Sequence, residues 1–446
     1  MKQPLITYIA QHKLRFLQYL LLAGFTAMLA ACQKGEIPNL NTPQVDAITR
    51  NPTKEELNNL VTGAESGMRF TLNTYYDAVG IVGREIYRFA GSEPRFTSEL
   101  LGGGSSTLDN NTFYITNPWA ARYRVVRQCN ILLQAAANSS FITDAQRKAY
   151  LGFAKTIMAY QLLLNLNMTD ANGIRISVQD FEKPGPIVAR NIALDSIAQM
   201  LEDGKADFTG SAVLFPLSSG FTGFNDAAGL LRFNRALAAR VAVYRQQWAQ
   251  ALAALNESFF DLNGSLTTGV YHTFGTGSGD QLNPCFFAQN VTGEVRVAHP
   301  SYAADITPGD DRIQKATLRT AAASQNGLSS NRDVWIYTSN TAPIPIIRNE
   351  ELILIYAEAK IQTNAFPDAV VALNRIRTAH NVAPYAGAVT QAALIDEMLR
   401  QRRYSLFYEG HRWIDLRRYN RLNTLPLDRP GDDVWQAFPI PQNENQ

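Results

Sequence analysis

Apolar residues recur at spacings of three and four positions along most of this chain, which is the periodicity of helices that bury one face. The pattern predicts helices over residues 54–74, 118–138, 144–167, 190–207, 229–260, 349–363, 367–380 and 391–409. The first of these follows Thr53 and begins with Lys-Glu-Glu, which is typical of an N-cap with an acidic first turn. The chain is therefore predicted to be mostly α-helical.

The segments between the predicted helices are long and rich in Gly, Ser, Thr, Asn and Pro. These excursions cover residues 80–117, 168–189, 209–226 and 261–347, and they contain short β-like runs such as 333–337. Connections of this length are uncommon in a compact domain and are usually functional. We therefore expect the excursions to carry function.

Two predicted helical hairpins resemble each other. In the first, the Ala-rich stretch 237–243 leads through Trp248 to a second helix, and in the other, residues 355–361 lead through Phe366 in the same way. Small residues let two helices approach closely, and an aromatic residue at the turn fits between them, as in tetratricopeptide-like units. Two unrelated amphipathic hairpins remain the alternative, because the repeat is short and degenerate.

The start of the chain is typical of an export signal. A basic N-terminus precedes a mostly apolar run over 16–29, which is too short to span a bilayer. Residues 29–32, Leu-Ala-Ala-Cys, then resemble a bacterial lipobox, in which the thiol of Cys32 takes up diacylglycerol. The alternative is an ordinary cleavage site followed by an incidental cysteine. We expect a lipoprotein signal peptide over 1–31 and attachment to the membrane only through acyl chains on Cys32.

The rest of the chain is predicted to form a spacer and one globular body. Residues 32–52 are polar and rich in Pro and Asn, a composition that cannot bury apolar surface. Beyond this spacer we expect an N-terminal helical half over 53–260 and a C-terminal half over 261–446, packed as one globular unit. The 46% of hydrophobic residues is enough for a large core.

Charge and cysteine content narrow the function classes. The 41 Lys and Arg residues against 39 Asp and Glu give a net charge of +2, with no basic block of the kind that binds nucleic acid. Cys129 and Cys285 are interpreted as buried small hydrophobes, with one disulfide between them left open. The histidines lack metal-ligand spacing with cysteines or carboxylates. No metal, cofactor or nucleic-acid partner is expected.

The most specific motifs lie in the C-terminal third. They occupy residues 348–360, 373–377, 401–418 and 438–444, and the third of them contains EGHRWIDL. These stretches resemble the SusD/RagB family of Bacteroidetes outer-membrane lipoproteins, and weaker similarity extends over nearly the whole mature chain. Departures occur at Gln401 and Ser405, where family members usually carry Glu, and at the turn 170–173, and they put local ion pairs in doubt.

The resemblance implies a role in nutrient uptake. It implies a non-enzymatic binder on the outer face of the outer membrane, built on a tetratricopeptide-like scaffold, with a SusC-like TonB-dependent transporter as its partner. The expected ligand is an oligo- or polysaccharide that contacts the excursions. A peptide ligand is the first alternative, because part of the family handles peptides. A secreted glycoside hydrolase on a helical scaffold is the second, and the sequence names no ligand.

Aromatic and polar residues of two excursions are the candidate ligand contacts, because sugar rings present apolar C–H faces and hydroxyl edges. The candidates are Tyr87, Phe89, Arg95 and Phe96 in one excursion and Tyr271 and Phe274 in the other. For any single ring, packing in the core is the alternative.

A set of charged residues lies among apolar helical positions of the C-terminal third. The set comprises Glu358, Arg377, Arg402, Glu409, Arg412 and Asp415. Charges rarely bury unless they are paired, so we predict a structural ion-pair network. The alternative, with Glu409 and Asp415 as a catalytic acid and base, would need a cleft and a split of their pKa values that nothing in the sequence indicates.

Overall fold

The computed structural model describes Lys13 and residues 45–445. Apart from Lys13, the predicted signal peptide lies outside the described residues, as do Cys32 and most of the spacer. Residues 48–446 form one compact unit, and helix α2 (Val45–Thr49) crosses its boundary. The helices of this unit are α3 (Lys54–Gly67), α4 (Leu72–Val82), α5 (Phe113–Asn138), α6 (Asp144–Thr169), α7 (Arg190–Phe208), α8 (Ala227–Tyr244), α9 (Trp248–Glu257), α10 (Pro300–Asp305), α11 (Asn349–Gln362), α12 (Phe366–Ala379), α13 (Gln391–Ser405) and α14 (Arg412–Arg418).

Helix starts follow the capping chemistry that the sequence indicates. The Thr53 hydroxyl accepts the N–H of Glu56, and the Glu56 carboxylate accepts the N–H of Thr53, which makes a reciprocal capping box at α3. The predicted helix 54–74 is in fact two helices, because Thr71 adopts a left-handed conformation with φ 50° just before α4. Helix α5 begins earlier than the predicted residue 118 and contains Pro118 within it.

The hairpins α8–α9 and α11–α12 turn with the same backbone geometry. The middle residue of each turn is left-handed, with φ 58° at Gln246 and φ 59° at Asn364. In both turns the residue before the second helix donates its N–H to the carbonyl five positions back, at 2.8 Å, which is a Schellman closure. Trp248 and Phe366 then open the second helices. Both hairpins are therefore built on one plan.

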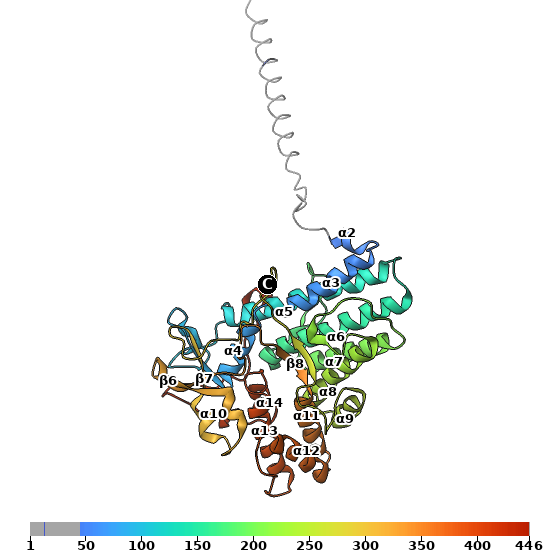
Figure 1. The fold of residues 1–446 in the computed structure, drawn as a ribbon. Helices are drawn as coiled ribbons and strands as arrows, with labels where there is room; N and C mark the ends of the chain where they lie inside the picture. Colours follow the sequence, from blue (N-terminus) through green and yellow to red (C-terminus); the bar gives the residue numbers. More distant parts are fainter. Residues whose placement is uncertain (1–12, 14–44, 446) are drawn as a thin grey trace, which may run out of the picture. The chain divides into compact units, whose positions relative to one another are not determined.

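The helices pack largely in chain order. Helix α5 contacts α6, α6 contacts α7, α7 contacts α8 and α8 contacts α9, and α11 joins α8 and α9 to α12 and α13 (Figure 1). A second cluster of buried apolar residues, from α11, α12 and α13, lies apart from the main core. Stacked hairpins of this kind are tetratricopeptide-like, and the prediction of a mostly helical fold is confirmed.

Short strands form within the excursions. They are β1 (Ile86–Phe89), β2 (Ile174–Arg175), β3 (Ile187–Val188), β4 (Gly269–His272), β5 (Val295–Ala298), β6 (Ala316–Gln325), β7 (Leu328–Val334) and β8 (Ile344–Arg348). Antiparallel pairing gives a four-stranded sheet of order β1-β5-β7-β6 and the two-stranded sheets β2-β3 and β4-β8. Strand β7 ends at Val334, so the predicted run 333–337 is extended only at its start.

Pairing between distant segments joins the N-terminal and C-terminal parts of the unit. Strand β1 pairs with β5, with Ile86 opposite Ala298. Asp77 of α4 is fully buried and accepts two bonds from Arg296 of β5, at 2.6 and 2.9 Å. The Tyr408 hydroxyl also donates to Asp77, at 2.5 Å. Segments more than 200 residues apart in sequence therefore meet in one buried cluster.

The two described cysteines are core residues. Cys129 and Cys285 are both buried, and both are free thiols. Burial raises the pKa of each thiol, so both stay protonated. The disulfide that the sequence left open does not form. Among residues 45–445 no helix is long and apolar enough to cross a membrane.

Candidate ligand pocket

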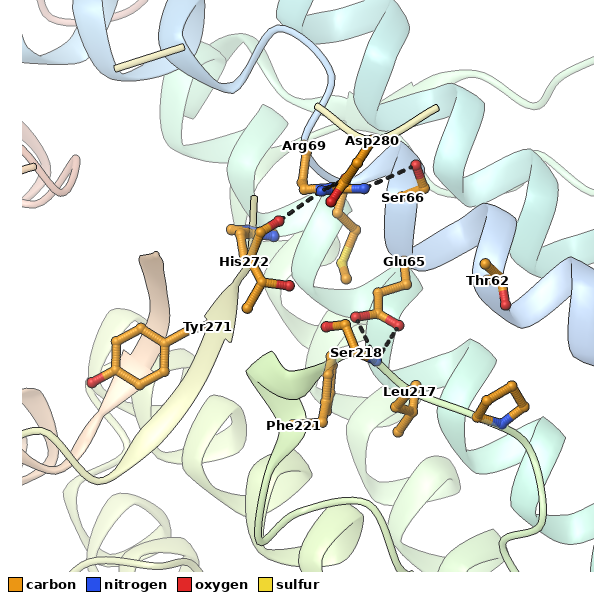
Figure 2. Close-up of a pocket in the computed structure, with 13 residues that line it drawn as sticks. Thr62, Glu65, Ser66, Arg69, Leu217, Ser218, Phe221, Tyr271, His272 and Asp280 are labelled. Atoms are coloured by element: carbon orange, nitrogen blue, oxygen red, sulfur yellow. Dashed lines mark hydrogen bonds and ion pairs between the residues drawn. The ribbon is translucent and has the colours of Figure 1, made fainter. Parts of the chain in front are cut away.

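A pocket of about 250 Å³ with both polar and apolar lining opens between α3, strand β4 and the loop at residues 216–221 (Figure 2). Its polar lining includes Thr62, Glu65, Ser66, Arg69, Ser218 and Asp280. Leu217 and Phe221 add apolar surface. A few convergent polar groups beside apolar surface are characteristic of small-molecule sites, although this cavity lies just below their usual volume of about 300–1,000 Å³.

Helix α3 supplies most of these polar groups. Thr62, Glu65 and Ser66 lie three and four positions apart on one face, and Arg69 follows the end of the helix at the same spacing. The cap of this helix is evident from the sequence, but the polar stripe was not predicted. Its signal is the spacing of three and four positions, which continues beyond the last helical residue.

The backbone of Ser218 holds the Glu65 carboxylate in place. The Ser218 N–H is shared between both carboxylate oxygens, at 3.2 and 3.1 Å (Figure 2). Burial raises the pKa of Glu65, while the bonds from Ser218 and the charge of Arg69 act in the opposite direction. Because a carboxylate has about four lone-pair sites, Glu65 keeps acceptor capacity for a ligand hydroxyl.

Arg69 spans the other wall of the pocket. Its Nη1 donates to the Thr273 carbonyl at 2.6 Å and to the Asp280 carboxylate at 2.5 Å, and its Nη2 donates to the Ser66 hydroxyl at 3.3 Å. The guanidinium also lies 5.7 Å from the centre of the Phe274 ring. These contacts fix the donor fork of Arg69 beside the cavity.

Strand β4 places Tyr271 and His272 on opposite faces. Figure 2 shows the Tyr271 ring on the side of β4 away from Glu65, and its hydroxyl donates to the Thr267 carbonyl. His272 is buried next to Tyr160, and burial lowers the pKa of His272 to about 3, so the imidazole is neutral. Phe274 is also buried. Tyr271 is among the residues that line the pocket, Phe274 lies against Arg69, and neither ring is an exposed platform.

The candidate rings of the other excursion lie in the core. Tyr87 and Phe89 stack at 5.6 Å on strand β1, and Phe96 packs edge to face against Phe113 at 5.2 Å. All three candidates are at most 4% exposed. For these three rings the alternative, packing in the core, is what the structure shows, because pairing of β1 with β5 draws this segment into the core.

Arg95 has the only half-exposed side chain of that group, with 41% of its surface accessible. It donates to the Glu93 carboxylate at 2.7 Å through both Nε and Nη2. No hydrogen bond or ring contact in the described part of the chain joins Arg95 or its neighbouring rings to Tyr271 and Phe274. The six candidates therefore do not form one surface.

Three of the predicted network charges meet around Arg418. Arg402 donates to Asp415 at 2.6 Å, and Arg418 donates to Asp415 at 2.8 Å and to Glu358 at 2.7 Å. All four side chains are at most 4% exposed. The carboxylates and guanidiniums alternate, so each buried charge has a counter-charge.

Glu409 and Arg377 belong to separate pairs. Glu409 binds Arg348 at the end of β8, and Arg377 binds Glu397 of α13. Glu409 and Asp415 are both buried against arginines. This arrangement gives neither carboxylate the open cleft that a catalytic acid–base pair requires.

Neutral residues take the places of the expected glutamates around Arg312. Gln401 Oε1 accepts a bond from Arg312 at 2.7 Å, and the Ser405 hydroxyl accepts one at 2.9 Å. The counter-charge of Arg312 is Asp310, at 2.6 Å. The departures at Gln401 and Ser405 therefore replace ion pairs with neutral acceptors and leave no buried donor unpaired at these two positions.

Arg412 is not part of the network. Its Nε donates to the Gly83 carbonyl at 3.1 Å, and it forms no ion pair with a carboxylate of the described residues. Burial, and then the charge of Arg403, lower the pKa of Arg412 to about 9. The predicted ion pair at Arg412 is wrong, because this first residue of α14 lines a cavity outside the Asp415 cluster.

Within the described ranges, no three His, Cys, Asp or Glu side chains converge in a way that could hold a metal ion.

A search by sequence among curated proteins finds no match. Residues 308–445 match the model of the SusD family.

A comparison with solved structures shows that other proteins share this fold. A SusD superfamily protein from Bacteroides vulgatus superposes with a TM-score of 0.66 at 15% identity, over 88% of this chain and 96% of that one. A SusD-like carbohydrate binding protein from the same species gives a TM-score of 0.63 at 18% identity, over 82% and 83%. Surface glycan-binding protein A from Bacteroides uniformis gives a TM-score of 0.61 at 17% identity, over 82% and 88%. The family match at the C-terminal end and the shared fold agree: residues 308–445 are similar to the SusD family, and the described unit has the fold of SusD superfamily structures.

Proposed function

We propose that this protein binds a glycan at the cell surface and delivers it to a SusC-like TonB-dependent transporter, without itself being an enzyme. Two structural neighbours are named as carbohydrate- or glycan-binding proteins, which supports a saccharide as the ligand class. The observation that carries the proposal is the pocket beside α3, where Glu65, Arg69 and Asp280 present fixed acceptors and donors.

This set of groups suits a sugar better than a purely apolar ligand. A sugar hydroxyl both donates and accepts, so one hydroxyl can donate to Glu65 while another accepts from Arg69. The apolar surface of Leu217 and Phe221 lies in the same cavity and offers a contact for the C–H face of a ring. Because the arginine and one carboxylate are already oriented by hydrogen bonds, little ordering is needed when a ligand binds.

Replacing Arg69 with Met is expected to weaken glycan binding roughly tenfold to a hundredfold, the effect of losing a hydrogen bond to a charged group. Glu65→Gln, which preserves shape and can still accept the Ser218 N–H, should weaken binding in the same direction. Isothermal titration against a glycan panel and a peptide mixture measures both effects. Arg232→Met on α8, an exposed arginine outside the pocket, is the matched control.

Two outcomes of this titration would change the proposal. Binding of peptides alone would favour the peptide-handling alternative. Wild-type affinity in both pocket variants would mean that the glycan binds elsewhere. A separate assay tests for hydrolysis. Turnover of a bound glycan by the purified protein, abolished by Glu409→Gln in a variant that still folds, would favour a hydrolase.

The proposed delivery role includes attachment of the body to the outer membrane, facing the cell exterior, through Cys32 and the spacer 32–52. Replacing Cys32 with Ala should leave an uncleaved or soluble precursor, because the acyl acceptor is lost while the export signal remains. Membrane fractionation with washes that strip peripheral proteins measures the effect. Undiminished recovery of the variant in the washed membranes would contradict lipid attachment at Cys32.

A further inference from the structure

A second cavity, of about 730 Å³, lies between α10, α13, α14 and the segment that follows α14. Its charged lining consists of Arg400, Arg403, Arg412 and Arg421 against Asp305 and Asp396. Four guanidiniums against two carboxylates leave an excess of positive charge. The pocket beside α3 has the opposite balance, with two carboxylates and one arginine.

Two of these arginines are already neutralised. Arg403 donates to Asp305 at 2.9 Å, and Arg421 pairs with Asp396. Arg400 lies 3.9 Å from the Glu397 carboxylate and is half exposed. The positive charge that lacks a partner is therefore concentrated on Arg412.

The two terminal nitrogens of Arg412 have no hydrogen-bond partner among the residues that the structure describes, since its one bond is made by Nε. Glu85 is the carboxyl group whose charge would act most strongly on Arg412, but burial raises the pKa of Glu85 to about 8. A largely neutral Glu85 cannot compensate the guanidinium. Arg412 thus presents free, charged donors to the cavity.

The Tyr404 hydroxyl is the second unsatisfied group. Tyr404 is 1% exposed, lines the cavity, and its hydroxyl makes no hydrogen bond with any described residue. The charges that act on this phenol are those of Arg403, Asp305, Arg412 and Arg400, all of which line the same cavity. A buried polar group without a partner is costly unless a ligand or water satisfies it.

We propose that this cavity is a binding site for an oxyanion, the carboxylate, sulfate or phosphate group of a small solute. The free end of Arg412 provides a planar pair of donors that matches an oxyanion, and Tyr404, whose hydroxyl is buried without a partner, lines the same cavity. Leu399, Leu416 and Pro426 supply apolar walls beside the charged end. This site is separate from the pocket beside α3 and does not depend on the function proposed for that pocket.

The test uses the purified full-length mature protein in a chloride buffer, with calorimetric titration of sodium sulfate, sodium glucuronate and glucose. Sulfate tests an oxyanion alone, glucuronate tests a carboxylate carried on a sugar, and glucose is the uncharged counterpart of glucuronate. We expect saturable binding of at least one of the two anions and none of glucose at the same concentrations.

Tyr404→Phe is the most informative variant. It removes a hydroxyl that has no partner to lose, so the melting temperature should stay the same or rise, while anion affinity should fall roughly tenfold, as when a hydrogen bond to a charged group is lost. Arg412→Gln should reduce affinity by at least as much. Arg232→Gln, an exposed arginine outside the cavity, should leave anion affinity unchanged.

Binding of sulfate alone would support an oxyanion site without sugar recognition, and binding of glucuronate alone would support an acidic saccharide. Absence of saturable binding for both anions would overturn the proposal. So would equal affinity for glucose and glucuronate, or unchanged anion affinity in folded Tyr404→Phe and Arg412→Gln.

Discussion

Replacing Asp77 with Asn is expected to lower the free energy of unfolding by about 3–5 kcal/mol, the cost of breaking a buried ion pair. Asp77 is fully buried and accepts bonds from Arg296 at 2.6 and 2.9 Å, from Arg88 at 2.5 Å and from the Tyr408 hydroxyl at 2.5 Å. Burial acts to raise the pKa of Asp77, but Arg296 and Arg88 outweigh it, so the pKa is lowered and the carboxylate stays charged. An Asn side chain would leave the buried guanidinium of Arg296 without a counter-charge.

Arg88 offers a matched control for this substitution. It also binds Glu294, at 3.1 Å, and the Glu294 side chain is 46% exposed. Glu294→Gln should therefore cost less than about 1 kcal/mol, because exposed pairs contribute little. Urea unfolding with an unchanged m-value measures both variants. Equal stability of wild type and Asp77→Asn would mean that the cluster does not hold the two parts of the unit together.

Asp77 also illustrates what the sequence could not predict. Besides Arg88, its partners are Arg296 on β5 and Tyr408, and nothing in the local pattern around residue 77 indicates contacts more than 200 residues away. By contrast, Arg402 and Asp415 were predicted to be paired charges, because they stand among apolar positions of nearby segments. Local periodicity predicts that such a charge is buried, but it does not identify the partner when the partner lies on another element.

The difference between local sequence pattern and long-range contact also explains where the candidate aromatic residues lie. The segment containing Tyr87, Phe89 and Phe96 is rich in turn residues, so its local pattern predicts an irregular excursion. Pairing of β1 with β5 is a long-range contact, and it is this contact that buries the rings. Tyr271 lies on β4, which forms one wall of the pocket, but the alternation of side chains along β4 turns its ring away from Glu65.

The helical scaffold could be predicted because its signals are local. Apolar spacing placed the helices, and the small residues and turn aromatics of 237–255 and 355–374 placed the hairpins. The pocket could not be predicted in the same way, since α3, β4 and the 216–221 loop meet only in the folded chain. The polar stripe of α3 is the one part of this site that a helical projection of the sequence would have revealed.

Stability is expected to fall as the pH rises from about 5 to above 8, and Glu85 is the cause. Burial raises the pKa of this carboxyl from 4.5 to about 8, and the charge of Arg412 offsets only part of that effect. Above pH 4.5 the unfolded chain releases the Glu85 proton while the folded chain keeps it. The contribution of Glu85 to the free energy of unfolding is therefore complete below pH 4.5 and is lost as the pH rises through 8. The free energy of unfolding should fall by about 4–5 kcal/mol over that range.

Glu85→Gln isolates this contribution, because glutamine has no proton to release and its amide oxygen can still accept the Tyr408 N–H, which Glu85 accepts at 3.2 Å. Wild type and variant should have similar free energies of unfolding near pH 5, and the variant should be the more stable at pH 8.5. Glu93→Gln is the control, because hydrogen bonds from Arg95 lower the pKa of Glu93, so its ionisation affects stability only at acidic pH. Urea unfolding at several pH values measures the difference between wild type and Glu85→Gln. A difference that stays constant from pH 5 to 8.5 would mean that Glu85 is ionised in the folded protein throughout, and Arg412 would then have a charged carboxylate behind it.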